Sequence, residues 1–299
     1  MRAYLTLLLS LAALWGASFM FIEIALDDLE PTTLMAGRCL IAVVFLLALM
    51  ASQRRLGALR GAGWRAYALG IVNSALPFTL IAWGQQHIDS GVAAIGNSTS
   101  PIWVAVLAIW LAHSERATGL RIVGIVVGLV GVAVLAGAQP DAGTWAIVGT
   151  LAVVLAAFLY ALASILIQRQ SARLDPLTLS ATTMVGASVV LLPFGIAQAP
   201  STRPGWESVA AVLVLGIAGT GVGILIFMKI ISDYGSFRAQ LVTYLLPVTA
   251  LLYGTLLLGE TVTGWMVVGL LLILTGVALG SGALRPQRVR DEVAEPARP

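Results

Sequence analysis

The chain reads as two diverged copies of one unit, joined near Thr144, and each copy carries five apolar stretches long enough to cross a membrane. A unit that crosses the bilayer an odd number of times delivers the chain to the opposite side before its copy begins. The second copy is therefore expected to lie upside down relative to the first. This topological constraint limits the possible folds more strongly than any single motif.

Composition places the chain in a membrane, because hydrophobic residues make up 59% of it, charged residues only 10%, and the mean hydropathy is +0.96. A soluble chain of this length needs more charged surface. We expect an all-α integral membrane protein with ten transmembrane helices, built as two inverted five-helix repeats over 1–144 and 145–284, and a disordered cytoplasmic tail over 285–299. The expected spans are 4–24, 32–50, 65–86, 90–111, 119–137, 145–167, 177–199, 208–231, 238–258 and 263–282.

The basic residues fall on one side of these spans. Of the seventeen Lys and Arg residues, fifteen lie in loops or at span ends on one side, Arg203 lies on the other, and Arg38 lies inside a span. Loops rich in Lys and Arg stay on the cytoplasmic side. The bias therefore predicts a multi-pass protein of the inner (plasma) membrane with its N- and C-termini in the cytoplasm.

The two copies align with a nearly constant offset. Trp15 aligns with Tyr160, Pro31 with Pro176, Pro101 with Pro247, Glu115 with Glu260, and Thr118-Gly119 with Thr263-Gly264. Glu115 falls on the cytoplasmic side and Glu260 on the outer side, as inversion requires of equivalent positions. Inverted repeats with a midplane site where they meet are typical of secondary transporters.

These residues resemble the EamA-type members of the drug/metabolite transporter superfamily over nearly the whole chain. The resemblance rests on the order and doubling of Trp15-Gly16-Ala17-Ser18-Phe19, Pro31 followed by Arg38, Pro101, Glu115, Pro247 and Leu258-Gly259-Glu260. It implies export or exchange of small metabolites such as amino acids. The chain looks most like the amino-acid exporter branch, of which the YddG-type aromatic amino-acid exporters are one example.

Glycines and prolines interrupt corresponding spans, where they weaken the helix or free a carbonyl for a ligand. The predicted helix-break or hinge residues are Pro77, Pro101, Gly219, Gly221, Gly223 and Pro247. Close packing between helices is the alternative role for any one of them. Their paired positions favour moving parts of an alternating-access cycle.

Polar and aromatic side chains inside the spans mark a candidate cavity, because each intramembrane polar group needs a partner or water. The predicted substrate-binding residues are Trp15, Asn73, Pro77, Phe78, Asn97, Trp103, Tyr160, Ser164, Phe227 and Tyr244. Hydrogen bonding between helices is an alternative role for the hydroxyls, and core packing is an alternative for the aromatic rings.

Two intramembrane charges, Glu23 and Arg38, lie at similar depth on either side of a short outer loop. An isolated charge at the bilayer centre costs about 2.5 to 3.5 kcal/mol on the insertion scale. We expect the two to form a structural ion pair or a shared network. The rival role for Arg38 is to hold the cavity wall or to attract a carboxylate.

Acidic residues are missing from the centres of the expected spans. Proton antiport through a central acid is therefore disfavoured, and facilitated diffusion or exchange is the simpler mechanism. The expected partners are a small-molecule substrate such as an amino acid and membrane lipid, without nucleic acid. Ten spans suffice for a functional monomer. Efflux of drugs or other hydrophobic compounds is the alternative within transport.

An enzymatic function is not expected. The chain lacks H-E-x-x-H, G-x-S-x-G, a nucleophile paired with a base and a cluster of acids for a metal. No catalytic residue, metal or cofactor is therefore predicted, and a membrane-embedded enzyme acting on lipid head groups is the disfavoured alternative.

Overall fold

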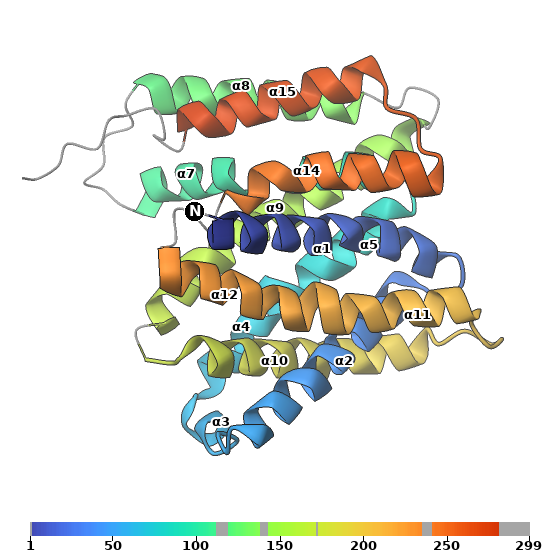
Figure 1. Cartoon of the computed structure of the whole chain (residues 1–299). Helices are drawn as coiled ribbons and strands as arrows, with labels where there is room; N and C mark the ends of the chain where they lie inside the picture. The colour runs from blue at the N-terminus through green and yellow to red at the C-terminus, as the bar shows by residue number, and fades with distance from the viewer. Residues whose placement is uncertain (1, 112–118, 138–142, 172, 235–240, 281–299) are drawn as a thin grey trace, which may run out of the picture.

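The structure is a computed structural model that describes residues 2–111, 119–137, 143–171, 173–234 and 241–280. Regular secondary structure in these residues is helical throughout (Figure 1). The aligned acid Glu115 and the tail over 285–299 lie outside the described residues.

The first repeat holds long helices and interrupted ones. Its third expected span is one rod in which a π-helical segment, η1, separates two α-helices, and its fourth span is divided by a turn at Ser98 and Thr99. The elements are α1 (Arg2–Leu26), α2 (Pro31–Ser52), α3 (Ala58–Gly61), α4 (Trp64–Gly70), η1 (Ile71–Ala75), α5 (Leu76–Gln85), α6 (Ser90–Asn97), α7 (Ser100–Leu111) and α8 (Gly119–Ala136).

The second repeat follows the same order. A π-helical segment, η3, again interrupts its third rod, and another, η4, ends its fourth. The elements are α9 (Gly143–Ser171), α10 (Pro176–Ala197), α11 (Trp206–Val214), η3 (Leu215–Val222), α12 (Gly223–Tyr234), α14 (Val242–Tyr253), η4 (Gly254–Leu258) and α15 (Gly264–Gly280).

Local sequence explains several helix ends. Pro31 and Pro176 occupy the first turns of α2 and α10, where a proline removes no intrahelical hydrogen bond. Asp175 caps α10, because its Oδ1 accepts a hydrogen bond from the Thr178 backbone N–H at 3.1 Å. Gly259 ends η4 with a φ of 72°, a conformation that favours glycine.

The molecule is a multi-pass membrane protein. Among the described residues, six helical segments of 22 to 26 residues are long and apolar enough to cross a bilayer, and three shorter apolar helices accompany them. Large apolar side chains are exposed along these helices, as lipid contact requires. Trp64, Trp145, Trp206 and Trp265 stand exposed near helix starts, where interfacial tryptophans are common.

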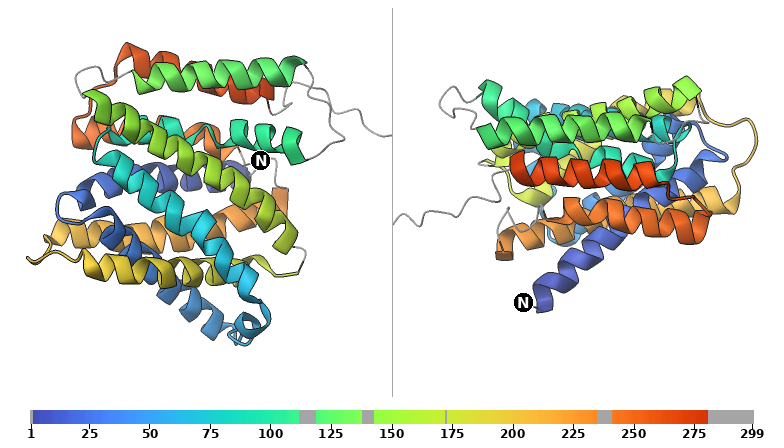
Figure 2. Two further views of the ribbon diagram at one scale, coloured as in Figure 1. Left: turned by 180° about the vertical axis from the view of Figure 1, so that it is seen from behind. Right: turned by 90° about the horizontal axis from the view of Figure 1, so that it is seen from above.

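Helices pack mainly across the two repeats rather than within one. α1 packs against α14 and the α11–η3–α12 rod, and its equivalent, α9, packs against α6, α7 and the α4–η1–α5 rod. Equivalent helices also pack on each other, α2 on α10 and α8 on α15, the second pair lying along one edge of the molecule (Figures 1 and 2). The helices of the two repeats therefore interleave, and exchanging each helix for its equivalent in the other repeat gives the same pattern of contacts.

The equivalent helices α2 and α10 run in opposite directions. At one end, Thr33 near the start of α2 donates hydrogen bonds to the carbonyls of Gly195 (2.9 Å) and Gln198 (3.0 Å) at the end of α10. At the other end, Arg55 after α2 pairs with Asp175 before α10 at 2.8 Å. This antiparallel contact is the arrangement expected of inverted repeats.

Glycines seat the α4 end of the interrupted rod tightly on α10. A Cβ on Gly186 would overlap the carbonyl of Tyr67, and a Cβ on Gly70 would overlap the carbonyl of Thr183. Such contacts let membrane helices approach closely enough for extensive packing. α10 therefore fixes the position of α4, and with it the start of η1.

Candidate functional site

A buried guanidinium lies where the two repeats meet. Arg38, on α2, is 7% exposed, and its Nε donates a hydrogen bond to the Thr220 hydroxyl in η3 at 2.9 Å. Its guanidinium carbon lies 4.0 Å from the centre of the Phe78 ring on α5, a cation–π distance. Arg38 therefore joins elements of both repeats.

The ion pair expected between Glu23 and Arg38 is not formed. Glu23 instead accepts a hydrogen bond from Gln85 Nε2 at 3.0 Å, and the same nitrogen donates to the Phe19 carbonyl at 2.9 Å. The short loop between α1 and α2 sets the depth of the two charges, but the rotation of each helix sets where its side chains point. Arg38 points to η3 and α5, and no carboxylate of a described residue pairs with it.

Aromatic rings continue from Arg38 to α9. The Phe78 ring meets the Tyr160 ring at 6.5 Å and 64°, an edge-to-face arrangement. Trp103, on α7, meets Phe158 of α9 in the same way at 5.7 Å and 90°. Phe78, Trp103, Tyr160 and Tyr244 are all partly buried and border one hydrophobic cluster. The structure thus brings α5, α7, α9 and α14 together around predicted site residues.

Two predicted residues carry buried polar atoms without a hydrogen-bond partner. These atoms are the Asn97 side-chain oxygen, at the end of α6, and the Trp103 indole nitrogen. Buried polar atoms are nearly always hydrogen-bonded, so an unpaired acceptor and donor in adjoining helices call for water or a ligand.

Trp15 and Phe227 lie beside η3. The Trp15 indole nitrogen donates to the Gly219 carbonyl at 2.9 Å, and the two rings lie 5.3 Å apart. A π-helical turn departs from the regular α-helical bonding pattern, and such turns are frequent at functional sites. The indole N–H of Trp15 therefore already donates its hydrogen bond to η3.

The remaining predicted residues are less central. Asn73, in η1, donates to the Ser74 hydroxyl at 3.2 Å, and Pro77 is buried in the first turn of α5. Ser164 is exposed, and its hydroxyl donates to the Ala161 carbonyl at 2.7 Å. The Ser164 hydroxyl is thus bonded within its own helix and makes no hydrogen bond to Arg38.

Sequence reasoning missed two residues that partner the intramembrane charges Arg38 and Glu23. Thr220 stands between predicted hinge glycines, and a hydroxyl in an interrupted helix was a signal that it faces a partner. Gln85 is a buried amide at the end of an apolar helix, and a polar side chain in that position is a signal for a hydrogen bond across helices. We define the Arg38 cluster as Arg38, Phe78, Tyr160 and Thr220.

The predicted helix breaks coincide with irregular segments in three of the four spans. η1 ends two residues before Pro77, η3 contains Gly219 and Gly221 and is followed by Gly223, and Pro101 follows the turn between α6 and α7. Pro247 instead lies inside α14, and the irregular segment of that span is η4, further along the chain. Equivalent rods of the two repeats are therefore interrupted at matching places by η1 and η3.

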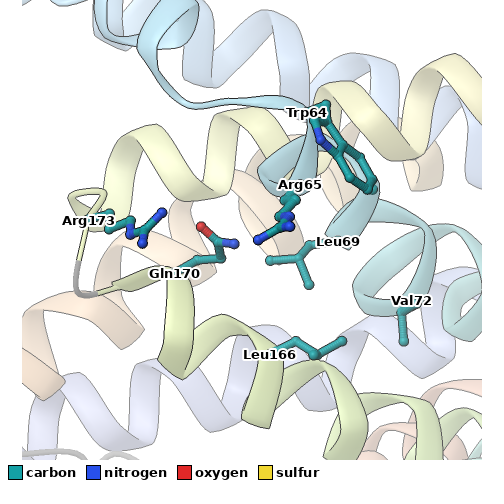
Figure 3. A pocket seen from close by; sticks show the side chains of 8 residues that line it. Trp64, Arg65, Leu69, Val72, Leu166, Gln170 and Arg173 are labelled. Carbon is teal, nitrogen blue, oxygen red and sulfur yellow. The ribbon is translucent and has the colours of Figure 1, made fainter.

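A separate cavity of about 460 Å³ lies between α4, η1 and the end of α9 (Figure 3). None of the predicted substrate-binding residues lines it. The lining residues are Trp64, Arg65, Ala68, Leu69, Val72, Leu166, Gln170 and Arg173. We call this cavity the inner-end pocket, because its basic residues belong to the side expected in the cytoplasm.

Metal ligands do not gather in the described part of the chain, where no group of three His, Cys, Asp or Glu side chains could hold an ion. Cys39 is a buried free cysteine next to Arg38 in sequence. The chemistry that the described site offers is therefore that of a guanidinium, hydroxyls, amides and aromatic rings.

Comparison with known families decides the relationship. The EamA-like transporter family matches the chain twice, over residues 2–137 and 147–281. The chain belongs to the EamA-like transporter family. The two matches fall on the two repeats.

Full-length relatives carry transporter names. The chain is 28% identical to an uncharacterized transporter of Archaeoglobus fulgidus, covering 93% of this chain and 98% of that one. It is 23% identical to the uncharacterized transporter YoaV of Bacillus subtilis, covering 94% and 98%. It is 26% identical to the uncharacterized inner membrane transporter YedA of Escherichia coli K12, covering 88% and 86%.

A crystal structure shares the fold of this EamA-like protein. The two superpose with a TM-score of 0.67 at 20% sequence identity, covering 95% of this chain and 98% of the other. At this identity the likeness shows the fold alone.

Proposed function

We propose that this EamA-like protein is a secondary transporter that exports small metabolites, most specifically amino acids with apolar or aromatic side chains. The observation that carries the proposal is Arg38, a buried cation between the repeats with no acidic partner among the described residues. A substrate carboxylate supplies the missing counter-charge, since guanidinium groups bind carboxylates with paired hydrogen bonds. Phe78 and Tyr160 offer rings to an apolar side chain.

The proposed topology has ten spans in two inverted halves, with both termini in the cytoplasm and the protein in the inner membrane. The antiparallel packing of α2 on α10 and the single-sided distribution of basic residues support it. The division of the fourth span into α6 and α7 explains why it falls short as a single long helix.

The paired interruptions support transport by alternating access. η1 and η3 lie at equivalent places, and both adjoin the Arg38 cluster: Thr220 belongs to η3, and Phe78 follows η1 by three residues. Bending at these segments, with Pro101 and Pro247 as further hinges, would expose the cluster to each side in turn. Facilitated diffusion or exchange needs no further group.

The decisive experiment is counterflow of labelled amino acids in proteoliposomes without a pH gradient. We expect transport by the wild-type protein, and a KM raised about tenfold to a hundredfold by Arg38→Gln, because a hydrogen bond to a charged group contributes about 1.5 to 3 kcal/mol. Arg60→Gln, which removes an exposed charge on α3, is the matched control and should leave the KM unchanged.

Two results would count against this function. Equal KM values for wild type and Arg38→Gln, with the variant folded, would remove the proposed carboxylate contact. Transport that occurs only with an imposed pH gradient would refute facilitated movement.

Efflux of hydrophobic compounds is the second candidate function, favoured by the ring contacts of Phe78, Tyr160 and Trp103. Competition by uncharged aromatic compounds, undiminished by Arg38→Gln, would support it.

A further inference from the structure

The inner-end pocket combines two basic side chains with an amide. Arg65, on α4, and Arg173, after α9, both line it, and Gln170 lies between them (Figure 3). The Arg65 guanidinium carbon lies 5.8 Å from the Trp64 ring centre. The pocket thus presents two guanidinium groups and an amide on a cavity wall.

The positive charge of the pocket is not neutralised by the described protein. None of the lining residues is acidic, and neither arginine forms an ion pair with a described residue. The nearest acid in sequence, Asp175, is already engaged by Arg55 at 2.8 Å and by the Thr178 hydroxyl at 2.6 Å. In the described part of the chain, the pocket therefore presents two exposed guanidinium groups without an acidic partner, and an anion can bind to them.

The remaining walls of the pocket are apolar. Leu69, Val72 and Leu166 line it alongside the arginines. Trp64 also lines it and is 74% exposed, in the position of an interfacial tryptophan at a helix start. An occupant that matches these walls carries its negative charge on a polar head and continues into an apolar part.

We propose that the inner-end pocket binds the phosphodiester head group of an anionic phospholipid from the adjacent leaflet. Arg65 and Arg173 hold the phosphate oxygens, since guanidinium groups match phosphate geometry with paired hydrogen bonds. Gln170 donates a further hydrogen bond, and the first acyl carbons lie on Leu69, Val72 and Leu166. Basic pockets between membrane helices on the cytoplasmic side suit such head groups.

The position of the pocket links the bound lipid to a moving part. Val72 belongs to η1, and Leu69 lies in the last turn of α4 directly before it. A lipid held between α4 and α9 therefore braces the interrupted rod against the second repeat at this end. Lipid binding would stabilise the protein whether or not its substrate is an amino acid.

The test measures lipid retention by native mass spectrometry and thermal unfolding of the purified full-length protein in neutral detergent. The added probes are phosphatidylglycerol, phosphatidylcholine and inorganic phosphate. We expect phosphatidylglycerol to be retained and to raise the unfolding temperature, and the other two to do neither. Arg65→Gln with Arg173→Gln should weaken retention about thirtyfold, since each basic residue contributes about one kcal/mol to anionic-lipid attraction.

The matched control is Arg60→Gln with Arg203→Gln, which removes two exposed charges outside the pocket and should retain phosphatidylglycerol as the wild type does. Equal retention of phosphatidylglycerol and phosphatidylcholine, or full retention by Arg65→Gln with Arg173→Gln, would overturn the proposal. Stabilisation by inorganic phosphate at the same concentration would assign the pocket to a free anion instead. Counterflow in neutral-lipid vesicles tests the transport function separately.

Discussion

The two ends of the molecule are joined in different ways. At the end holding the loops after α1 and α5, acids of one repeat accept hydrogen bonds from backbone N–H groups of the other. Asp28 Oδ2 accepts from the Gly205 N–H and from the Ser208 hydroxyl, both at 2.7 Å. Glu260 accepts from the N–H groups of Ser90 (2.9 Å) and Gly91 (3.1 Å) at the start of α6.

The opposite end is joined more loosely in the part that the structure describes. Its cross-repeat ion pair, Arg55 with Asp175, is 42% and 35% exposed on the two side chains, and the inner-end pocket is lined by residues of α4 and of the end of α9. Exposed pairs contribute little because water competes for both partners. The comparison teaches that charge-assisted hydrogen bonds to backbone join the repeats at the end with Asp28 and Glu260, whereas the opposite end has an exposed ion pair and the inner-end pocket.

The substitution expected to weaken the contact between the repeats most is Glu260→Ala. It leaves two N–H groups at the start of α6 without their acceptor. A negative charge at a helix N-terminus is also favourable in itself. In a protein carrying Cys39→Ala and Ser90→Cys, the thiol should react with a membrane-impermeant maleimide at least about tenfold faster after Glu260→Ala. Glu207→Ala, an exposed acid at the same end, is the control. Unchanged labelling would show that Glu260 does not hold this end closed.

A smaller effect is expected from Asp28→Asn, and it should depend on pH. Hydrogen bonds from Ser208 and from the Gly205 backbone hold the pKa of the Asp28 carboxyl below its ordinary value. A carboxyl with a lowered pKa stabilises the folded protein above its unfolded pKa of about 3.9, and this contribution is lost as pH falls through the folded pKa. In thermal unfolding from pH 7 to pH 3, the unfolding temperature should fall more steeply for the wild type than for Asp28→Asn. Parallel curves would contradict this assignment.

The smallest change in the free energy of unfolding is expected from Arg55→Gln at the opposite end. Burial opposes ionisation of Asp175, but hydrogen bonds from Thr178 and the charge of Arg55 together hold its pKa below the ordinary value. Because both side chains are exposed, removing Arg55 should change the unfolding free energy by only about 0.2 to 1 kcal/mol. High salt should erase the difference between wild type and variant in unfolding experiments. A loss as large as that of Glu260→Ala would overturn the contrast between the ends.

Sequence reasoning located the apolar helices and three of the interruptions, including the turn before Pro101, because these depend on local composition. Pro77 and the glycines between Gly219 and Gly223 weaken their own helices, and η1 and η3 lie beside or upon them. Pro247 did not mark an interruption, since it lies inside α14, and neighbouring helices can accommodate a proline within a helix. η4 forms instead before Gly259, where the chain turns through a positive φ.

The contacts of the site depended on helix rotation, which sequence alone does not provide. Glu23 and Arg38 were expected to meet because a short loop joins their helices, but Gln85 and Thr220 supply their partners. The contact between Phe78 and Tyr160 joins residues far apart in the chain. Each such pair is set by the packing of several helices at once, and no spacing along one helix encodes it.

The antiparallel contact between α2 and α10 has an evolutionary consequence. In a protein of half this length, the same contact would form between two identical subunits inserted in opposite directions, as an isologous interface. Every substitution there would appear on both sides, and a buried cation would face its own copy. A fused gene escapes that restriction. The position equivalent to Arg38, counted from Pro31 and Pro176, is Thr183, so a single asymmetric charge can occupy an otherwise symmetric scaffold.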